Sequence, residues 1–134
     1  MSSTSTLEKY IKEMSEDVKV DEFNLKDVQM SLPALKHKWV GRLMRHKNTI
    51  NDLLSAKTSA KNTVVKQLQD NSNYKVAQAV AERQAEFHDT IVRINKKVKE
   101  EKLVVELLEK AEKIFSSMTF DIKNITEIVK LETL

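Results

Sequence analysis

Apolar residues recur at intervals of three and four through the middle of the chain, the spacing that predicts one buried face of an α-helix. When each residue is turned by about 100°, six apolar residues fall within about 40° of Trp39: Leu35, Leu43, Ile50, Leu53, Val64 and Leu68. Pro33 suits the first turn of a helix, where its missing N–H is not needed. The pattern therefore predicts one long helix over residues 31–68 with a single apolar stripe.

Three polar residues, His46, Lys57 and Lys61, fall on the same stripe. Two lysines four residues apart on a face that should be buried are unexpected in the core of a monomer. Either the helix frays or turns its face beyond Ser55 and the lysine stems reach water, or the face lines a groove or pore in an assembly. The sequence leaves both interpretations open.

Shorter helices are predicted before the long one. Ser5 and Glu8 have the spacing of a capping box. Four apolar residues recur there at helical intervals: Leu7, Ile11, Met14 and Val18. They predict a first helix from Ser5 to about Asp17. Asp21 is a candidate N-cap for a second short helix that contains Phe23, Leu25 and Val28.

Residues 69–73 read Gln-Asp-Asn-Ser-Asn, a polar stretch rich in turn-forming residues. It predicts a reversal of the chain into a long antiparallel helical hairpin, with the second long helix over residues 74–116. A heptad-like apolar seam supports that helix: Ala77, Val80, Phe87, Ile91, Ile94, Val98, Val105 and Leu108. A last short amphipathic helix is predicted within residues 120–134.

Composition favours the same all-α fold. The 134 residues include one Gly, one Pro and no Cys, with 32% charged and 5% aromatic residues. Scarce turn formers argue against strands, and abundant Lys, Glu, Leu, Val and Ala are typical of long helices. We expect an acidic N-terminal helical arm over residues 1–30, a basic helical hairpin over residues 31–118 and a C-terminal assembly helix over residues 119–134.

Self-association is expected from the C-terminal half. Near its end the second long helix is apolar on more than one side, so either the chain's own last segment or other subunits must cover it. We expect both kinds of cover. The candidate assembly residues are Leu103, Val104, Leu107, Leu108, Ile114, Phe115, Phe120, Ile122 and Ile125.

Charge is segregated along the chain. Residues 31–66 hold eight basic residues and one acid, a net charge of +7, although the whole chain carries only +3. Residues 1–30 hold seven acids and four lysines, a net charge of −3. Positive charge concentrated on one helix indicates a polyanionic partner. The acidic arm either docks on the basic helix or is a solvated helix, and we adopt the second, more ordinary interpretation.

Catalytic and metal-binding patterns are missing from the sequence. His37, His46 and His88 lack zinc-site spacing, and no thiolate is available. One glycine cannot build a phosphate loop. The acids near the end of the second helix alternate with lysines at i,i+4 spacing, as in Glu106 and Lys110, which is typical of a solvated face. We expect neither an enzyme nor a cofactor. No window approaches the roughly 18 apolar residues of a spanning helix, and we expect a cytosolic protein.

Three groups of residues, in order along the chain, resemble one known family. The first is Asp17, Val20-Asp21 and Leu25, followed by Pro33-Ala34-Leu35-Lys36-His37-Lys38-Trp39. The second is the Lys-rich helix with its polar break and second long helix. The third is Ile114 followed by Phe120-Asp121-Ile122-Lys123-Asn124-Ile125. Together they resemble the UvsY-type recombination mediators of T4-like bacteriophages.

The sequence departs from the family pattern at four places. Lys36 stands at the family histidine, Trp39 at the family tyrosine, and Met118 at the arginine before the terminal Phe. The Tyr-Tyr-x-Gly that often closes the basic helix is replaced by Gln67-Leu68-Gln69-Asp70. The last departure leaves no sequence support for DNA stacking at the end of that helix.

The resemblance implies a non-enzymatic, helical protein that forms rings of six or seven subunits. It implies binding to single-stranded DNA, contacts with the phage recombinase and single-strand-binding protein, and help to the recombinase in replacing that protein, in the cytoplasm of the infected bacterial host. The family's basic cluster maps near Lys57 and Lys61. The candidate DNA contacts, to phosphates and not to bases, are Lys36, Lys38, Arg42, Arg45, Lys57, Lys61 and Lys66.

Two other functions stay open for a basic helical chain. One is an oligomeric scaffold or adaptor that binds acidic partners and no nucleic acid. The other is a basic amphipathic helix that lies on an anionic membrane. This function is the weaker of the two, because the polar face lacks the aromatic insertion side that such helices show. Trp39 is a candidate for base stacking, but its place on the apolar stripe favours packing in the core.

Overall fold

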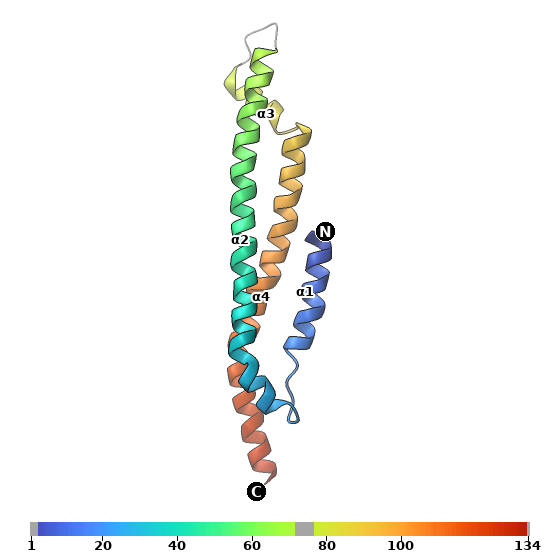
Figure 1. The fold of residues 1–134 in the computed structure, drawn as a ribbon, viewed down its shortest axis with the longest axis vertical. Coiled ribbons are helices and arrows are strands. Elements are labelled where there is room, and N and C mark those ends of the chain that lie inside the picture. The colour runs from blue at the N-terminus through green and yellow to red at the C-terminus, as the bar shows by residue number, and fades with distance from the viewer. Residues whose placement is uncertain (1–2, 72–76, 134) are drawn as a thin grey trace. The chain divides into compact units, whose positions relative to one another are not determined.

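The computed structural model describes residues 3–71 and 77–133, which form four α-helices (Figure 1). The helices are α1 (Ser3–Asp17), α2 (Leu25–Asp70), α3 (Gln78–Ala85) and α4 (Asp89–Glu132). No strand occurs among the described residues, which confirms the all-α fold class. The chain packs as two compact units. The first comprises Met1–His46 and Leu103–Leu134, and the second comprises Lys47–Lys102.

Helix α2 begins earlier than the sequence pattern predicted. The Oδ1 atom of Asp21 accepts hydrogen bonds from the N–H groups of Phe23 and Asn24, and Asn24 Oδ1 accepts the N–H of Asp21. This reciprocal cap starts the helix at Leu25. The short helix expected after Asp21 is therefore the first part of α2, and the expected start near Pro33 was wrong.

Pro33 lies inside α2 and not in its first turn. A proline in a helix leaves the carbonyl four residues before it without a backbone donor. That carbonyl belongs to Gln29, whose residue is exposed, so water can satisfy it. The proline is tolerated because the interrupted hydrogen bond lies on a solvated side of the helix.

The second long helix predicted over residues 74–116 is interrupted. Helix α3 ends at Ala85, and α4 begins at Asp89 after a turn in which Phe87 and His88 donate backbone hydrogen bonds to Gln84 and Ala85. The Nδ1 atom of His88 accepts the N–H of Thr90 at 3.2 Å, which caps the first turn of α4. The predicted helix start, near Tyr74, lies outside the described residues.

The interruption changes the phase of the predicted apolar seam. From Ile91 onward the seam is buried or half-buried as expected. Before the turn it is exposed, and Phe87 has 83% of its surface accessible. Ala81 and Ala85 are the buried residues of α3 instead. A turn between two helices resets the angular position of every residue before it, so a single 3.6-residue period could not describe both.

The expected separate C-terminal helix was also wrong, because α4 continues without a break to Glu132. Polar residues near the predicted boundary do not cap a new helix. Ser117 Oγ instead donates to the carbonyl of Ile114 one turn earlier, at 2.9 Å. Such hydrogen bonds leave the helix intact. Met118 and Ile122 continue the buried stripe of Phe115 along the same helix.

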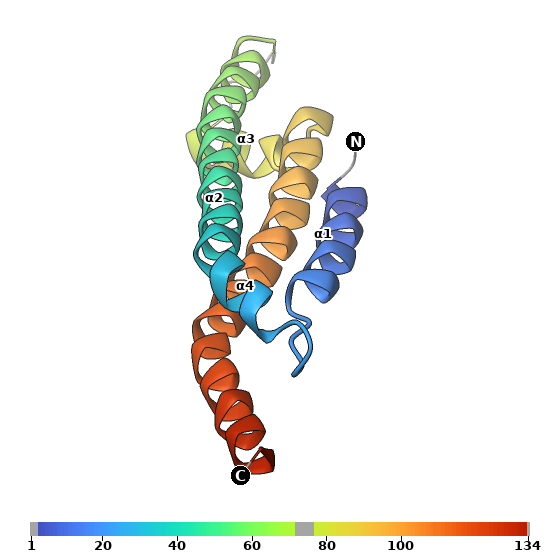
Figure 2. The same cartoon turned by 60° about the horizontal axis from the view of Figure 1, so that its bottom comes forward.

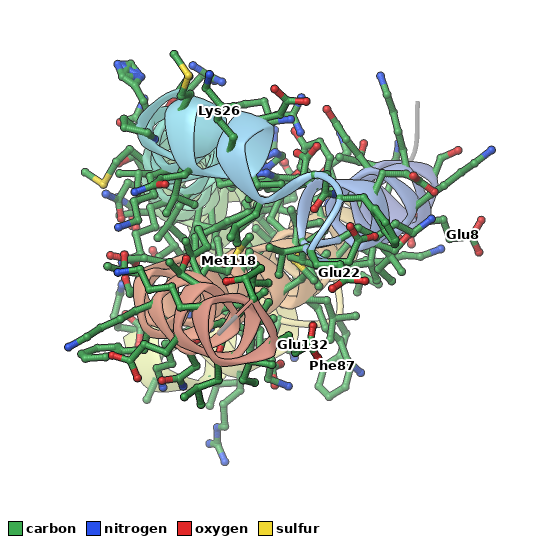
Figure 3. The ribbon with its side chains drawn as sticks, turned by 90° about the horizontal axis from the view of Figure 1, so that it is seen from below. Glu8, Glu22, Lys26, Phe87, Met118 and Glu132 are labelled. Carbon is green, nitrogen blue, oxygen red and sulfur yellow. The ribbon has the colours of Figure 1, made fainter. Side chains whose placement is uncertain are left out.

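The first unit is built around Trp39, which is 1% exposed. Its ring stacks on Phe115 of α4, with centroids 6.1 Å apart, and meets the ring of Tyr10 of α1 edge-on at 5.8 Å. The chain reverses between α1 and α2 (Figure 2). Met118 points from α4 toward α2 and is 2% exposed (Figure 3). Trp39 is therefore a core residue that joins three helices, as its place on the stripe predicted.

The second unit has a smaller core. Val64 and Val65 of α2 pack with Ala81 and Ala85 of α3, and the partly buried Leu68 packs against this group. Two alanines one turn apart present little bulk, which lets the short α3 approach α2 closely. All six residues predicted to share the stripe of Trp39 are buried or half-buried in the units to which they belong.

Candidate nucleic-acid interface

Two cations of α2 in the first unit meet an acidic helix. Arg42 makes a two-point ion pair with Glu13 of α1, with Nη1–Oε2 and Nη2–Oε1 distances of 2.6 and 3.1 Å. Lys38 Nζ lies 3.2 Å from Glu13 Oε1 and also donates to Asp17. The interpretation of the acidic arm as a merely solvated helix was wrong, because α1 docks on α2 through these carboxylates.

Aromatic rings complete this contact between α1 and α2. The Nε1–H of Trp39 donates to Asp17 Oδ2 at 2.9 Å. The guanidinium of Arg42 lies over the rings of both Tyr10 and Trp39, 4.7 and 4.8 Å from their centroids. The Tyr10 hydroxyl and His46 Nε2 are hydrogen-bonded at 3.1 Å. Arg42 is thus held by a carboxylate and by two aromatic faces, which both attract cations.

In the second unit, the two lysines on the apolar stripe share one acid. Lys61 Nζ lies 2.8 Å from Glu86 Oε1, and Lys57 Nζ lies 4.0 Å from Glu86 Oε2. Glu86 is in the turn between α3 and α4. The side chains of Lys57 and Lys61 are 28% and 31% exposed. Helix α2 neither frays nor turns its apolar face away at these lysines. Both lysines contact the carboxylate of Glu86, which the turn after α3 places beside them.

These ion pairs shift the pKa values of their members. The hydrogen bond from Arg42 lowers the pKa of Glu13 below its ordinary value, against the opposing effect of desolvation, and Glu13 in turn raises the pKa of Arg42. The hydrogen bond between Lys61 and Glu86 lowers the pKa of Glu86 and raises the pKa of Lys61. All four groups are therefore charged near neutral pH, as ion pairing requires.

The other candidate DNA contacts have different surroundings. Arg45 and Lys66 are exposed on α2. Lys36 is half-buried and lines a cavity of about 190 Å³ beside Trp39 and Glu112. Lys47 is a further exposed cation of α2 that counted toward the basic helix but was not among the candidate contacts. The seven candidates thus divide into three groups: Lys38 and Arg42, which meet two acids of α1; Lys57 and Lys61, which share the single acid Glu86; and three further residues spread along the helix.

Glu13, Asp17 and Glu86 were missed as members of this surface. A signal for the first two exists in the sequence, because Glu13 and Asp17 are four residues apart, as are Lys38 and Arg42. Equal one-turn spacing lets two helices pair acid with base at successive turns. Glu86 gave no such signal, because its position depends on the turn that ends α3.

The candidate assembly residues divide into three groups by their burial. Val104, Leu108, Phe115 and Ile122 are buried within the chain itself, with exposed fractions of 0–5%. Leu107 and Ile125 are half-buried. Leu103, Ile114 and Phe120 are exposed by 50%, 38% and 69%. The first group forms the core of the first unit, and the last group remains available to another molecule.

Residues 3–71 and 77–133 contain neither a metal site nor a membrane-spanning helix. No group of three or more His, Asp or Glu side chains there is arranged to hold a metal ion. None of the described helices is both long and apolar enough to cross a membrane.

Comparison with known proteins gives a family match. A family model described as "Recombination, repair and ssDNA binding protein UvsY" matches residues 13–133 of the 134. Neither a curated protein nor a solved structure matches the chain significantly. The match includes all of α2, α3 and α4 and the acidic end of α1 that holds Lys38 and Arg42. The chain belongs to the UvsY family of recombination, repair and single-stranded-DNA-binding proteins.

Proposed function

We propose that the protein is a recombination mediator: it binds single-stranded DNA through α2 and helps the phage recombinase replace the single-strand-binding protein on the strand. The observation that carries this proposal is the charge of α2. Residues 25–70 hold nine basic and three acidic residues, a net charge of +6. Residues 89–132 of α4 hold nine of each, a net charge of zero. In a family described as binding single-stranded DNA, the strand belongs on the basic helix.

The contacts are electrostatic and independent of sequence. The exposed Arg45 and Lys66 and the half-exposed Lys57 and Lys61 place cations along α2 within reach of a phosphate backbone. Each phosphate they neutralise releases condensed counterions, which drives binding without reading bases. Lys36, Lys38 and Arg42 contribute further contacts once their surroundings open. The buried Trp39 stacks no base while it remains in the core.

Assembly multiplies the site. We propose a hairpin of α2 with α3 and α4 that assembles into a ring-like homo-oligomer of six or seven copies through Leu103, Ile114 and Phe120. Leu107 and Ile125 stand at the edge of this surface. Repeated weak sites on one particle raise the overall affinity by about 10²–10⁴-fold when one strand can reach several of them. A ring also imposes its own path on the strand, which opposes the path required by the single-strand-binding protein.

The partners follow from this role. The recombinase and the single-strand-binding protein of the phage are the protein partners, and the cytoplasm of the infected bacterium is the place of action. No cofactor and no bond-breaking step are needed, because exchange of one protein for another on a strand requires only competing affinities. This role rests on the family description of recombination and repair.

Binding of a fluorescent oligo-dT by the full-length chain tests the proposal. The variant Lys57→Ala with Lys61→Ala is expected to bind at least about tenfold more weakly, because two phosphate contacts are lost per copy. The control is Lys96→Ala with Lys97→Ala, which removes the same charge from exposed positions of α4. Equal loss in both variants would remove the assignment to α2, and no binding by the unmodified chain would favour the scaffold function.

Mediator activity is tested separately with the recombinase and DNA coated by the single-strand-binding protein. The unmodified chain is expected to shorten the lag before the recombinase hydrolyses ATP on that DNA. The Lys57 and Lys61 variant is expected to leave the lag unchanged. A lag that the chain never shortens would contradict the mediator role and leave DNA binding intact.

A further inference from the structure

We infer that α1 is a built-in competitor for the DNA site: Glu13 and Asp17 hold Lys38 and Arg42, and a bound strand displaces α1 from them. This inference rests on the proposed function, since it concerns how the same basic helix is regulated. It makes the first unit a closed form of a binding surface whose cations and indole are covered by the chain itself.

The carboxylates of α1 occupy the positions that phosphates would take. Arg42 donates two parallel hydrogen bonds to Glu13, a fork geometry that fits carboxylate and phosphate oxygens equally. Lys38 is shared between Glu13 and Asp17. Two acids face two cations here, so this group offers no net positive charge to a strand, whereas Lys57 and Lys61 share the single acid Glu86 and keep a net positive charge. Exchange of a carboxylate for a phosphate conserves the ion pair, so the displacement requires no uncompensated charge.

Helix α1 can leave without dismantling the core. None of its side chains over residues 5–17 is buried. The buried residues of the first unit lie on α2 and α4, and Trp39 keeps its stack on Phe115 when Tyr10 departs. The contacts that α1 loses include the ion pairs, the Trp39–Asp17 and Tyr10–His46 hydrogen bonds, the aromatic edge contacts and the packing of the half-buried Leu7 and Met14. The ion pairs lie at a partly solvated surface, where each contributes little, and the apolar packing that is lost involves only half-buried side chains.

The chain between the helices keeps α1 close after release. Residues 18–24 join it to α2, and Asp21 and Asn24 cap the start of α2 and hold that end of the linker in place. A competitor tethered by so short a segment acts at a high effective concentration, of order millimolar. Single phosphates are therefore excluded, whereas a strand that contacts several sites on α2 can displace it.

Release of α1 uncovers an aromatic surface beside the two cations. Trp39 lies between Lys38 and Arg42 in contact with both, at 5.2 and 4.8 Å from its centroid. A positively charged surface with an accessible aromatic ring is the usual means of holding single-stranded nucleic acid. The stacking residue that the exposed surface of α2 lacks is present beneath α1.

The first experiment compares two charge-matched variants in oligo-dT binding. Glu13→Gln with Asp17→Asn removes the competitor. Glu8→Gln with Glu16→Gln removes the same charge from exposed positions of the same helix, and Glu8 points away from the other helices (Figure 3). We expect the first variant to bind about five- to tenfold more tightly than the second, because only the first frees Lys38 and Arg42. Equal affinities would overturn the inference.

The second experiment needs no substitution. Hydrogen exchange of the unmodified chain is measured with and without saturating oligo-dT. The amides of α1 are expected to lose protection in the complex while those around Lys38 to Arg42 gain it. An α1 that keeps its protection in the complex would also overturn the inference. If neither the unmodified chain nor the Glu13 and Asp17 variant binds oligo-dT, the proposed function itself fails. If both bind oligo-dT with the same affinity as the control variant, only the competitor role fails.

Discussion

Glu86 Oε1 lies 2.8 Å from Lys61 Nζ, so an acid from the turn between α3 and α4 holds a lysine in the C-terminal part of the basic helix. Lys57, one turn earlier, shares the same carboxylate at 4.0 Å. The arrangement explains why two lysines are found on the apolar stripe of α2. It also places a negative group where the proposed function requires a phosphate, and it therefore predicts how binding responds when that group is neutralised.

Neutralising Glu86 should strengthen DNA binding. In Glu86→Gln the two lysines no longer share an internal counter-ion, and we expect a several-fold higher affinity for oligo-dT because phosphates replace the lost carboxylate. The control is Glu109→Gln, an exposed acid on α4. Anisotropy titrations at one fixed salt concentration measure both. An affinity that falls in Glu86→Gln would mean that Glu86 positions the lysines instead of competing for them.

Stability should decrease in acid because of Glu13. The hydrogen bond from Arg42 lowers the pKa of Glu13 from 4.5 in the folded chain. Glu13 therefore stabilises the fold fully at pH values above its pKa in the unfolded chain, and this stabilisation is lost as the pH falls through its pKa in the folded chain. We expect the free energy of unfolding to decline below about pH 4.5. The decline should be smaller in Glu13→Gln, which should itself lose about 1 kcal/mol at neutral pH. Urea unfolding at a series of pH values measures this; identical pH profiles for the two proteins would contradict it.

Trp39 should be a stabilising core residue whose indole N–H matters separately from its bulk. Trp39→Phe keeps a ring but loses the hydrogen bond to Asp17 and some packing, and we expect a loss of about 1–3 kcal/mol. Met44→Ala, at a position that is 59% exposed on the same helix, should change stability by less than about 0.5 kcal/mol. Urea unfolding followed by circular dichroism compares the two. A Trp39→Phe chain as stable as the unmodified one would show that the contact has no energetic role.

Periodicity was enough to predict the helical fold and the buried stripe, because the stripe depends only on angular spacing within one helix. It could not give the helix ends. A proline such as Pro33 can stand either in the first turn of a helix or inside it, and its presence does not say which. The cap formed by Asp21 and Asn24 starts the helix earlier and so places Pro33 inside it. The break before α4 depends on His88 acting as a cap, and histidine is not among the residues that signal one.

The cations of the candidate site were predictable from charge, whereas their partners were not. Which acid meets Lys61 depends on how α3 packs against α2, and that packing depends on Ala81 and Ala85 fitting under Val64 and Val65. The contact between α1 and α2 was accessible in part, through the matching spacing of acids and bases. The preference for a solvated α1 failed because Tyr10 and Trp39 add aromatic contacts to the ion pairs.

Assembly and folding should depend on different residues of α4. Leu103→Gln with Ile114→Gln changes two exposed positions eleven residues apart, which lie on the same side of a helix. We expect this variant to keep its helix content and to lose the proposed oligomer. Val104→Ala with Leu108→Ala changes buried positions and should lose several kcal/mol of stability. Sedimentation and urea unfolding separate the two effects, and an unchanged oligomer in the first variant would place the interface elsewhere.

The dependence of oligo-dT affinity on salt tests the central claim most directly, because it counts the phosphates that α2 neutralises. On single strands each neutralised phosphate contributes about −0.7 to the slope of log affinity against log salt concentration. We predict a steep negative slope for the unmodified chain and a slope closer to zero by about 1.4 for Lys57→Ala with Lys61→Ala, which corresponds to two lost contacts per binding site. A flat plot for the unmodified chain, or equal slopes for the two proteins, would contradict phosphate binding by these lysines.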